Sequence, residues 1–251
     1  MPNQPQISAP WAIVDGKSIG QWSKGWLNWV STAEADQPVG NLFGQSPASD
    51  ALNGDLNQSG PVFFLFGGNW GTPSPTAATV GSEPVINVPA GKDVLVPLVN
   101  AFDLEDGTQA NSTIHDWVAE THLSYADEAR IVPALASLSI RDAFISVATK
   151  DDPTHPFLSL QWPASAFSAA DSGLFSLGSL KPDSYLGSLG IKDLPFADVA
   201  GKWAMLTNLS KGDYVVNFGG STNATYDPLN PGAPPILAAA TYNTTDVLHV
   251  A

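Results

Sequence analysis

The chain has 251 residues, with 24 Asp and Glu against 10 Lys and Arg, so its formal net charge is −14. This charge argues against nucleic acid and anionic membrane surfaces as partners, because both bind clustered basic side chains. The chain has no cysteine, which excludes disulfides, thiolate nucleophiles and cysteine-ligated zinc or iron–sulfur sites.

A helix is predicted over residues 18–31. Ser18 and Gln21 have the spacing of a capping box, in which each side chain accepts a hydrogen bond from the backbone N–H of the other residue. Gly20 and Gly25 each lower the helix propensity by about 1 kcal/mol, which suggests that a neighbouring backbone comes close. Large apolar residues recur at steps of three and four on one face: Ile19, Trp22, Trp26, Trp29 and Val30. We expect this face to pack on a sheet; a platform for stacked ligands is the alternative.

A long surface loop is predicted at residues 36–60, followed by three strands. The strand at 62–66 is a continuous apolar run, which indicates that both of its faces are covered. Strands at 85–88 and 93–99 flank a turn. Pro97 cannot donate a ladder hydrogen bond, so it indicates an edge strand or a β-bulge.

A second, short helix is predicted at 114–124, where Thr113 and Asp116 form another capping pair. A hairpin is expected around 209–213, because Gly212 can adopt the positive φ of a tight turn. Residues 164–200 are rich in Ser, Gly and Leu, and we interpret them as an irregular covering segment. Further strands are expected at 135–140, 144–148, 157–162, 203–209, 214–218 and 236–250.

These elements predict a mostly β protein. Repeated short strands separated by turns, without βαβ alternation, favour a β-sandwich, jelly-roll-like, in a single domain over 1–251. The N-terminal helix within 1–35 would pack on this sandwich. No apolar run reaches about 18 residues, so no membrane span is expected.

Four segments carry a family resemblance. They stand here as Ser18-Ile19-Gly20-Gln21-Trp22, Pro61-Val62-Phe63-Phe64-Leu65-Phe66-Gly67, Val88-Pro89-Ala90-Gly91-Lys92 and Gly201-Lys202-Trp203 with Leu209 to Asp213 and Phe218-Gly219-Gly220. Their order and spacing resemble a family of exported, largely uncharacterised bacterial and fungal proteins. The resemblance implies a secreted or cell-surface β-sandwich and supplies no reaction.

This chain departs from the family pattern at three positions. Gln21 stands where the pattern has Glu, Asp213 where it has His, and Leu56 near a Cys of many members. If the Glu and His of the pattern perform chemistry, this chain has lost both groups. If they are a capping residue and a surface residue of a turn, nothing is lost, and Gln21 still caps the helix.

Four residues between 115 and 122 have the types that ligate zinc or manganese: His115, Asp116, Glu120 and His122. On a helix, His115 and His122 would share a face but lie about 10.5 Å apart along the axis, too far to ligate one ion together. In an extended segment, Glu120 and His122 would share a face. The alternative is an ordinary solvated helix face. These four residues are therefore the weak catalytic candidates of the sequence.

A second acidic cluster consists of Asn100, Asp103, Glu105 and Asp106. Carboxylate and amide oxygens crowded on a turn are suited to Ca²⁺, which prefers six to eight oxygen ligands. Acidic loops are also expected on a protein of this charge without any ion. Calcium is the cofactor that this second cluster suggests.

Trp70, with Asn69, lies between glycines and is the candidate for ligand contact at a loop tip; the alternative is that its ring folds back onto the sandwich. Together these features favour an exported non-catalytic β-sandwich for surface or matrix attachment or carbohydrate contact. Whether the chain is an enzyme stays open: the alternative is a cation-assisted hydrolase or lyase that uses carboxylates and His122. A second alternative is a structural subunit that forms homo-oligomers through an exposed strand, such as 239–250.

Overall fold

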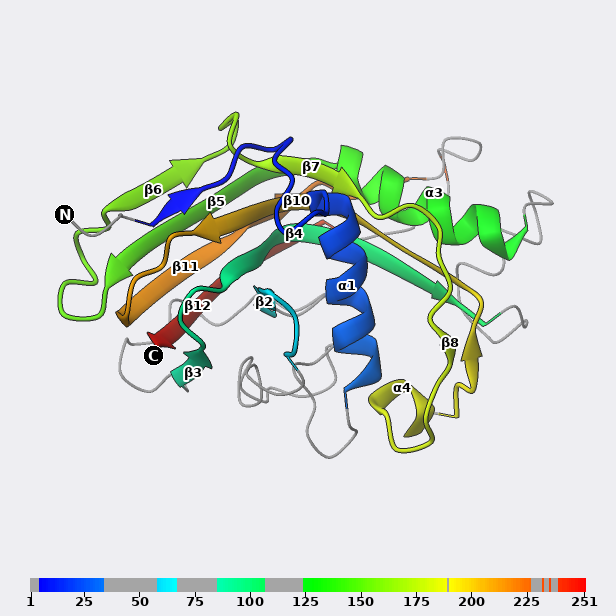
Figure 1. Ribbon diagram of the computed structural model, residues 1–251. Helices are drawn as coiled ribbons and strands as arrows, with labels where there is room; N and C mark the ends of the chain where they lie inside the picture. Colours follow the sequence, from blue (N-terminus) through cyan, green and yellow to red (C-terminus); the bar gives the residue numbers. More distant parts are fainter. Residues whose placement is uncertain are drawn as a thin grey trace.

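The computed structural model describes residues 5–33, 58–66, 85–106, 124–188, 190–226, 232, 235 and 239–251. In this part of the chain, two five-stranded sheets pack face to face, and a two-stranded sheet lies beside them (Figure 1). The predicted mostly β sandwich is therefore confirmed. No helix of the described residues has both the length and the apolar character needed to cross a membrane.

The first sheet has the order β1-β10-β4-β2, and β7 pairs with the same edge of β10 as β1. The strands β2 and β4 are parallel, whereas the other pairs of this sheet are antiparallel. The bounds are Gln6–Ile7 for β1, Val62–Phe64 for β2, Asp93–Glu105 for β4, Ser168–Asp171 for β7 and Phe196–Thr207 for β10.

The second sheet has the order β3-β12-β11-β5-β6, with β3 parallel to β12 and the other pairs antiparallel. Its strands are β3 (Val85–Val88), β5 (Ile140–Thr149), β6 (Leu158–Gln161), β11 (Gly212–Thr222) and β12 (Ala240–Val250). The small sheet pairs β8 (Gly178–Ser179) with β9 (Asp193–Leu194), and the short helix α4 (Tyr185–Ser188) lies between them in sequence.

The main core fills the space between the two large sheets. It is built from side chains that alternate along each strand, so that every second residue points inward. Both sheets contribute fully buried members to it, among them Phe63, Val96, Ile145, Phe218 and Leu248.

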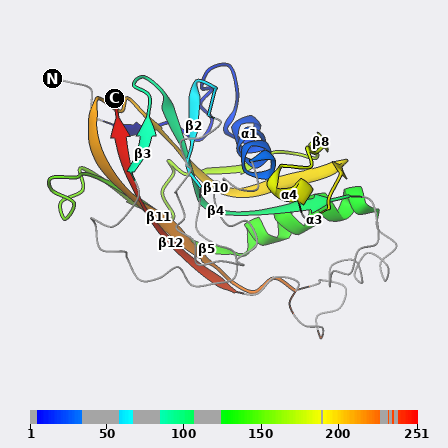
Figure 2. The same cartoon turned by 90° about the horizontal axis from the view of Figure 1, so that it is seen from below.

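The helix α1 (Ile19–Thr32) covers the outer face of the first sheet (Figures 1 and 2). Ser18 and Gln21 form the predicted capping box. The indole N–H of Trp26 donates to the carbonyl of Leu65 at 2.8 Å. A second apolar cluster lies under this helix and includes Trp22, Trp26, Trp29, Phe66 and Trp203. The prediction that the tryptophan face packs on a sheet is confirmed.

The close approach suggested by the helix glycines is also found. A Cβ added at Gly20 would lie 2.5 Å from the backbone oxygen of Asp171 in β7. At Gly25, an added Cβ would meet side chains, the ring of Phe64 at 3.2 Å and that of Trp22 at 3.9 Å. The backbone contact at Gly20 lets α1 lie close to the edge of the first sheet.

A second long helix, α3 (Tyr125–Leu138), packs against β4 and β10 on the face opposite to α1 (Figure 2). It continues through Ser139 directly into β5. The predicted strand at 135–140 is therefore wrong for residues 135–138, which are helical. The helix was not predicted from the sequence because Pro133 lies within it, and proline normally breaks the interior of a helix. The helix predicted at 114–124, apart from the cap residue Ser124, lies outside the described residues.

Three other expectations need correction. The 209–213 segment is no hairpin turn, because β10 and β11 belong to different sheets. The positive φ predicted for Gly212 is found, at 149°, and Asn208, just before the segment, has φ 61°. The segment 164–200 carries short regular elements and the first residues of β10. The last strand, β12, pairs with β11 along its length and with β3 at Val247–Val250, so this end of the strand is not free for self-assembly; oligomer formation itself stays a prediction.

Pro97 marks a β-bulge, as one of the two sequence alternatives predicted. Lys202 pairs with Val99 and Trp203 with Pro97, so Leu98 is an extra residue in β4. β4 lies between β10 and β2, but β2 pairs only with Asp93 to Leu95, so Pro97 lies beyond the part of β4 that pairs with β2. The loop predicted at 36–60 falls almost entirely outside the described residues.

Candidate functional site

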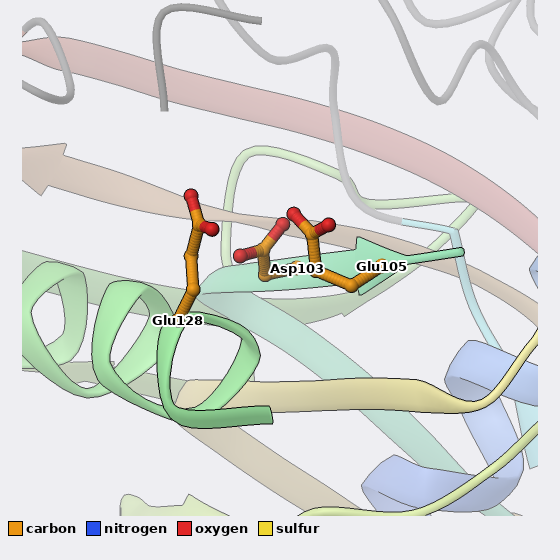
Figure 3. A group of neighbouring side chains, drawn as sticks. All are labelled: Asp103, Glu105 and Glu128. Atoms are coloured by element: carbon orange, nitrogen blue, oxygen red, sulfur yellow. The ribbon is translucent and has the colours of Figure 1, made fainter. Parts of the chain in front are cut away.

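Among the described residues, one group of three acidic side chains lies close enough together to hold a metal ion, and it is found between β4 and α3. It consists of Asp103 and Glu105 from the strand and Glu128 from the helix (Figure 3). One carboxylate oxygen of each residue lies within 4.8 Å of the corresponding oxygens of the other two. The carboxyl groups therefore come together from two elements that are separated in sequence.

The bulge in β4 decides which strand residues face α3. Before it, Val94 and Val96 point into the main core. Because the bulge inserts one residue, the inward positions change from even to odd numbers. Asp103 and Glu105 thereby face the same side as the main core, whereas Phe102 contacts Trp26 on the opposite side, with ring centroids 6.5 Å apart.

The third carboxyl group is positioned by the start of α3. Ser124 caps the helix and forms a capping box with Asp127, whose exposed carboxylate accepts hydrogen bonds from the backbone N–H and the hydroxyl of Ser124. The next residue, Glu128, turns toward the sheet. Because Glu128, Val132 and Ala136 recur every four residues, they share the buried face of the helix.

Glu128 is 0% exposed, and Glu105 is 5% exposed. Neither carboxylate oxygen of Glu128 has a hydrogen-bond partner among the described residues. A buried ionised carboxylate that lacks hydrogen bonds and an opposite charge is strongly unfavourable. Glu128 therefore requires either a proton or a cation.

The same burial raises the pKa values of two carboxyl groups of the cluster. Burial raises the pKa of Glu128 to about 8, and the negative charge of Asp103 adds to this effect. Burial also raises the pKa of Glu105 to about 8, with further contributions from the charges of Asp103, Glu128 and Asp106. Without a cation, Glu105 and Glu128 thus hold protons at neutral pH.

The ligand set is suited to a hard divalent cation. All three side chains offer oxygen, and no histidine belongs to the group. Oxygens on opposite sides of a Ca²⁺ ion lie up to about 5 Å apart, since Ca²⁺–O distances are about 2.3–2.6 Å. The three residues that would hold such an ion are Asp103, Glu105 and Glu128.

The sequence-predicted acidic cluster is divided by the strand. Asp103 and Glu105 face α3, whereas alternation after the bulge directs Asn100 to the opposite face. Asp106 follows the last residue of β4 and acts on the cluster through its charge. The cluster lies on a strand rather than on the expected turn, because β4 continues to Glu105. The other candidates, His115, Asp116, Glu120, His122, Asn69 and Trp70, lie outside the described residues.

Three buried acids were not predicted as site residues from the sequence: Glu128, Asp198 and, in β12, Asp246. Glu128 could have been recognised as an acid on an apolar face with Val132 and Ala136 at steps of four. Asp198 in β10 is 0% exposed and pairs in register with Asp103. Its carboxylate accepts a hydrogen bond of 2.6 Å from the hydroxyl of Ser172. Burial raises its pKa to about 6, although this hydrogen bond acts in the opposite direction.

The described histidines form surface pairs. His249 lies opposite Asp213, with Nδ1 and a carboxylate oxygen 2.6 Å apart, and both side chains are nearly half exposed. His155 contacts Asp152 in an exposed loop. Exposed pairs of this kind contribute little to stability.

Comparisons with known proteins found no matching family model, no similar curated protein and no similar solved structure.

Proposed function

We propose that this chain is an exported, non-catalytic β-sandwich protein that binds a divalent cation, with calcium as the favoured ion, and serves in surface or matrix attachment or carbohydrate contact. The observation that carries the cation is Glu128, fully buried without a hydrogen-bond partner and facing Asp103 and Glu105. Export is supported by the resemblance of the four sequence segments. Attachment or carbohydrate contact is supported by the scarcity of titratable residues and by Trp70 between glycines in the sequence.

Calcium is favoured over magnesium for geometric reasons. Mg²⁺ requires distances near 2.0–2.1 Å and usually keeps several water ligands. Two carboxyl groups as buried as Glu105 and Glu128 disfavour so many waters. Ca²⁺ accepts carboxylates with one or both oxygens and tolerates irregular geometry.

Burial also favours binding over catalysis. A general acid must contact the atom that it protonates. Glu128 is 0% exposed, so a polymer substrate has no access to its carboxyl group in this conformation. The raised pKa values of Glu105 and Glu128 are nevertheless typical of general acids, so a cation-assisted hydrolase or lyase is retained as the second candidate.

The cation proposal is tested by calorimetric titration of the full chain with calcium, magnesium and manganese. We expect one Ca²⁺ ion per chain in the wild type and no binding to the Glu128→Gln variant. The matched control is Asp127→Asn, which removes one negative charge from the same helical turn at an exposed position and should still bind calcium. Absence of binding of all three ions to the wild type would overturn the proposal.

The attachment role is tested separately, on immobilised glycans and matrix polymers. We expect retention of the chain on at least one polymer in calcium, reduced by a chelator, without formation of shortened products. Release of shortened or unsaturated products that stops in the chelator would instead establish the enzymatic alternative.

A further inference from the structure

The two long helices are anchored to the first sheet in different ways. α1 buries three tryptophans in an apolar cluster, and the indole N–H of Trp22 donates to the carbonyl of Val14 at 2.8 Å. The apolar side chains that α3 buries are small, and none belongs to either apolar cluster: Ala129, Val132, Pro133 and Ala136. α3 therefore buries smaller apolar side chains than α1 does, although its backbone lies close to β4 and β10.

The acidic cluster connects α3 to the sheet. Glu128 is contributed by the helix, and Asp103 and Glu105 are contributed by β4. A divalent ion held by all three side chains would attract carboxylates of the helix and of the strand at once. Its binding therefore favours the arrangement in which α3 is docked.

We propose that the bound cation acts as a latch for α3: when Asp103, Glu105 and Glu128 share the ion, the helix opens from β4 and β10 less often than it does without the ion. This inference rests on the proposed function, since it requires the ion at that site. β5 follows α3 directly but pairs with β11 and β6. Local opening of the helix therefore breaks no strand pairing of the second sheet.

The test is hydrogen exchange, measured by mass spectrometry on the full chain at pH 8.5, with saturating calcium or with a chelator. We expect backbone amides of residues 125–138 to exchange at least tenfold more slowly in calcium. Amides of residues 19–32 in α1 should exchange equally under both conditions, which provides an internal control.

The decisive variant is Glu105→Gln, because it changes the strand and leaves the helix sequence untouched. We expect it to abolish the effect of calcium on the exchange of α3. Asp103→Asn provides a second strand variant if Glu105→Gln does not fold by circular dichroism. Asp127→Asn weakens the helix cap but should retain the calcium effect.

The outcomes separate the latch from the ion site. Calcium binding measured by calorimetry, with the exchange of α3 unchanged, would overturn the latch and leave the proposed function standing. Calcium protection of α3 that persists in both strand variants would also overturn the latch. If calorimetry detects no ion, the proposed function fails and the latch fails with it.

Discussion

Replacing Glu128 by Gln should stabilise the protein at neutral pH when no cation is present. The carboxyl group of Glu128 has a pKa of about 8 in the folded protein and 4.5 in a model peptide. Since one pKa unit corresponds to about 1.4 kcal/mol, the buried acid lowers the free energy of unfolding at pH 7 by about 3 kcal/mol. Gln has the shape of the protonated acid and does not titrate.

The sign of the pH dependence follows from proton binding. Between pH 4.5 and 8 the folded protein binds more protons at Glu128 than the unfolded chain does, so stability falls as the pH rises through this interval. We therefore expect the advantage of Glu128→Gln to be close to zero at pH 4.5 and about 3 kcal/mol at pH 7. For a chain of this length, the difference corresponds to an increase in Tm of about 6–12 °C.

The assay is urea unfolding in a chelator at both pH values, repeated at pH 7 with calcium. Calcium at one hundred times its Kd should stabilise the wild type by about 2.7 kcal/mol and leave Glu128→Gln unchanged. A variant that is destabilised equally at pH 4.5 and pH 7 would refute the reasoning, because the unfavourable ionisation of Glu128 would then contribute nothing.

Three further substitutions test the packing of α1. Gly20→Ala places a Cβ 2.5 Å from the backbone oxygen of Asp171 and should lower the free energy of unfolding by about 1–3 kcal/mol in urea titrations; an unchanged midpoint would contradict the close approach. Trp26→Phe removes the hydrogen bond to Leu65 and part of a buried ring, so we expect thermal unfolding to show a loss of about 2–3 kcal/mol in the free energy of unfolding. A loss below about 0.5 kcal/mol, as for a surface substitution, would argue against this contact. Ser18→Ala removes the N-cap and should cost about 1 kcal/mol, with Ser18→Asn, which caps equally well, as the variant that should show no loss.

The sequence predicts α1 well because its local signals agree with its packing. The capping box sets its start, and the tryptophan face indicates the surface that it buries. For α3 the same signals conflict: Pro133 argues against a helix, although Ser124 and Asp127 form a capping box. Tertiary packing against β4 and β10 decides this conflict, and such packing is not visible in local sequence.

The candidate site could be predicted only in part for a related reason. Asp103 and Glu105 are close in sequence, so their proximity could be inferred. Glu128 reaches them only through the docking of α3, a contact between residues more than twenty positions apart. The direction in which Asp103 points also depends on the bulge. Pro97 indicates that a bulge is present, but the position of the extra residue is known only from the pairing of β4 with β10.

The extra residue in β4 exchanges the faces of the first sheet to which the odd- and even-numbered residues of the strand point. Deleting Leu98 would restore strict alternation, so the downstream carboxylates would be forced beneath the tryptophan layer while Phe102 and Leu104 turned toward α3. Both faces of the sheet would be destabilised: the α1 face would bury acidic groups, and it would also lose the packing of Phe102 against Trp26. The number of residues between Pro97 and Asp103 therefore decides whether the carboxylates face α3 or the tryptophans of α1.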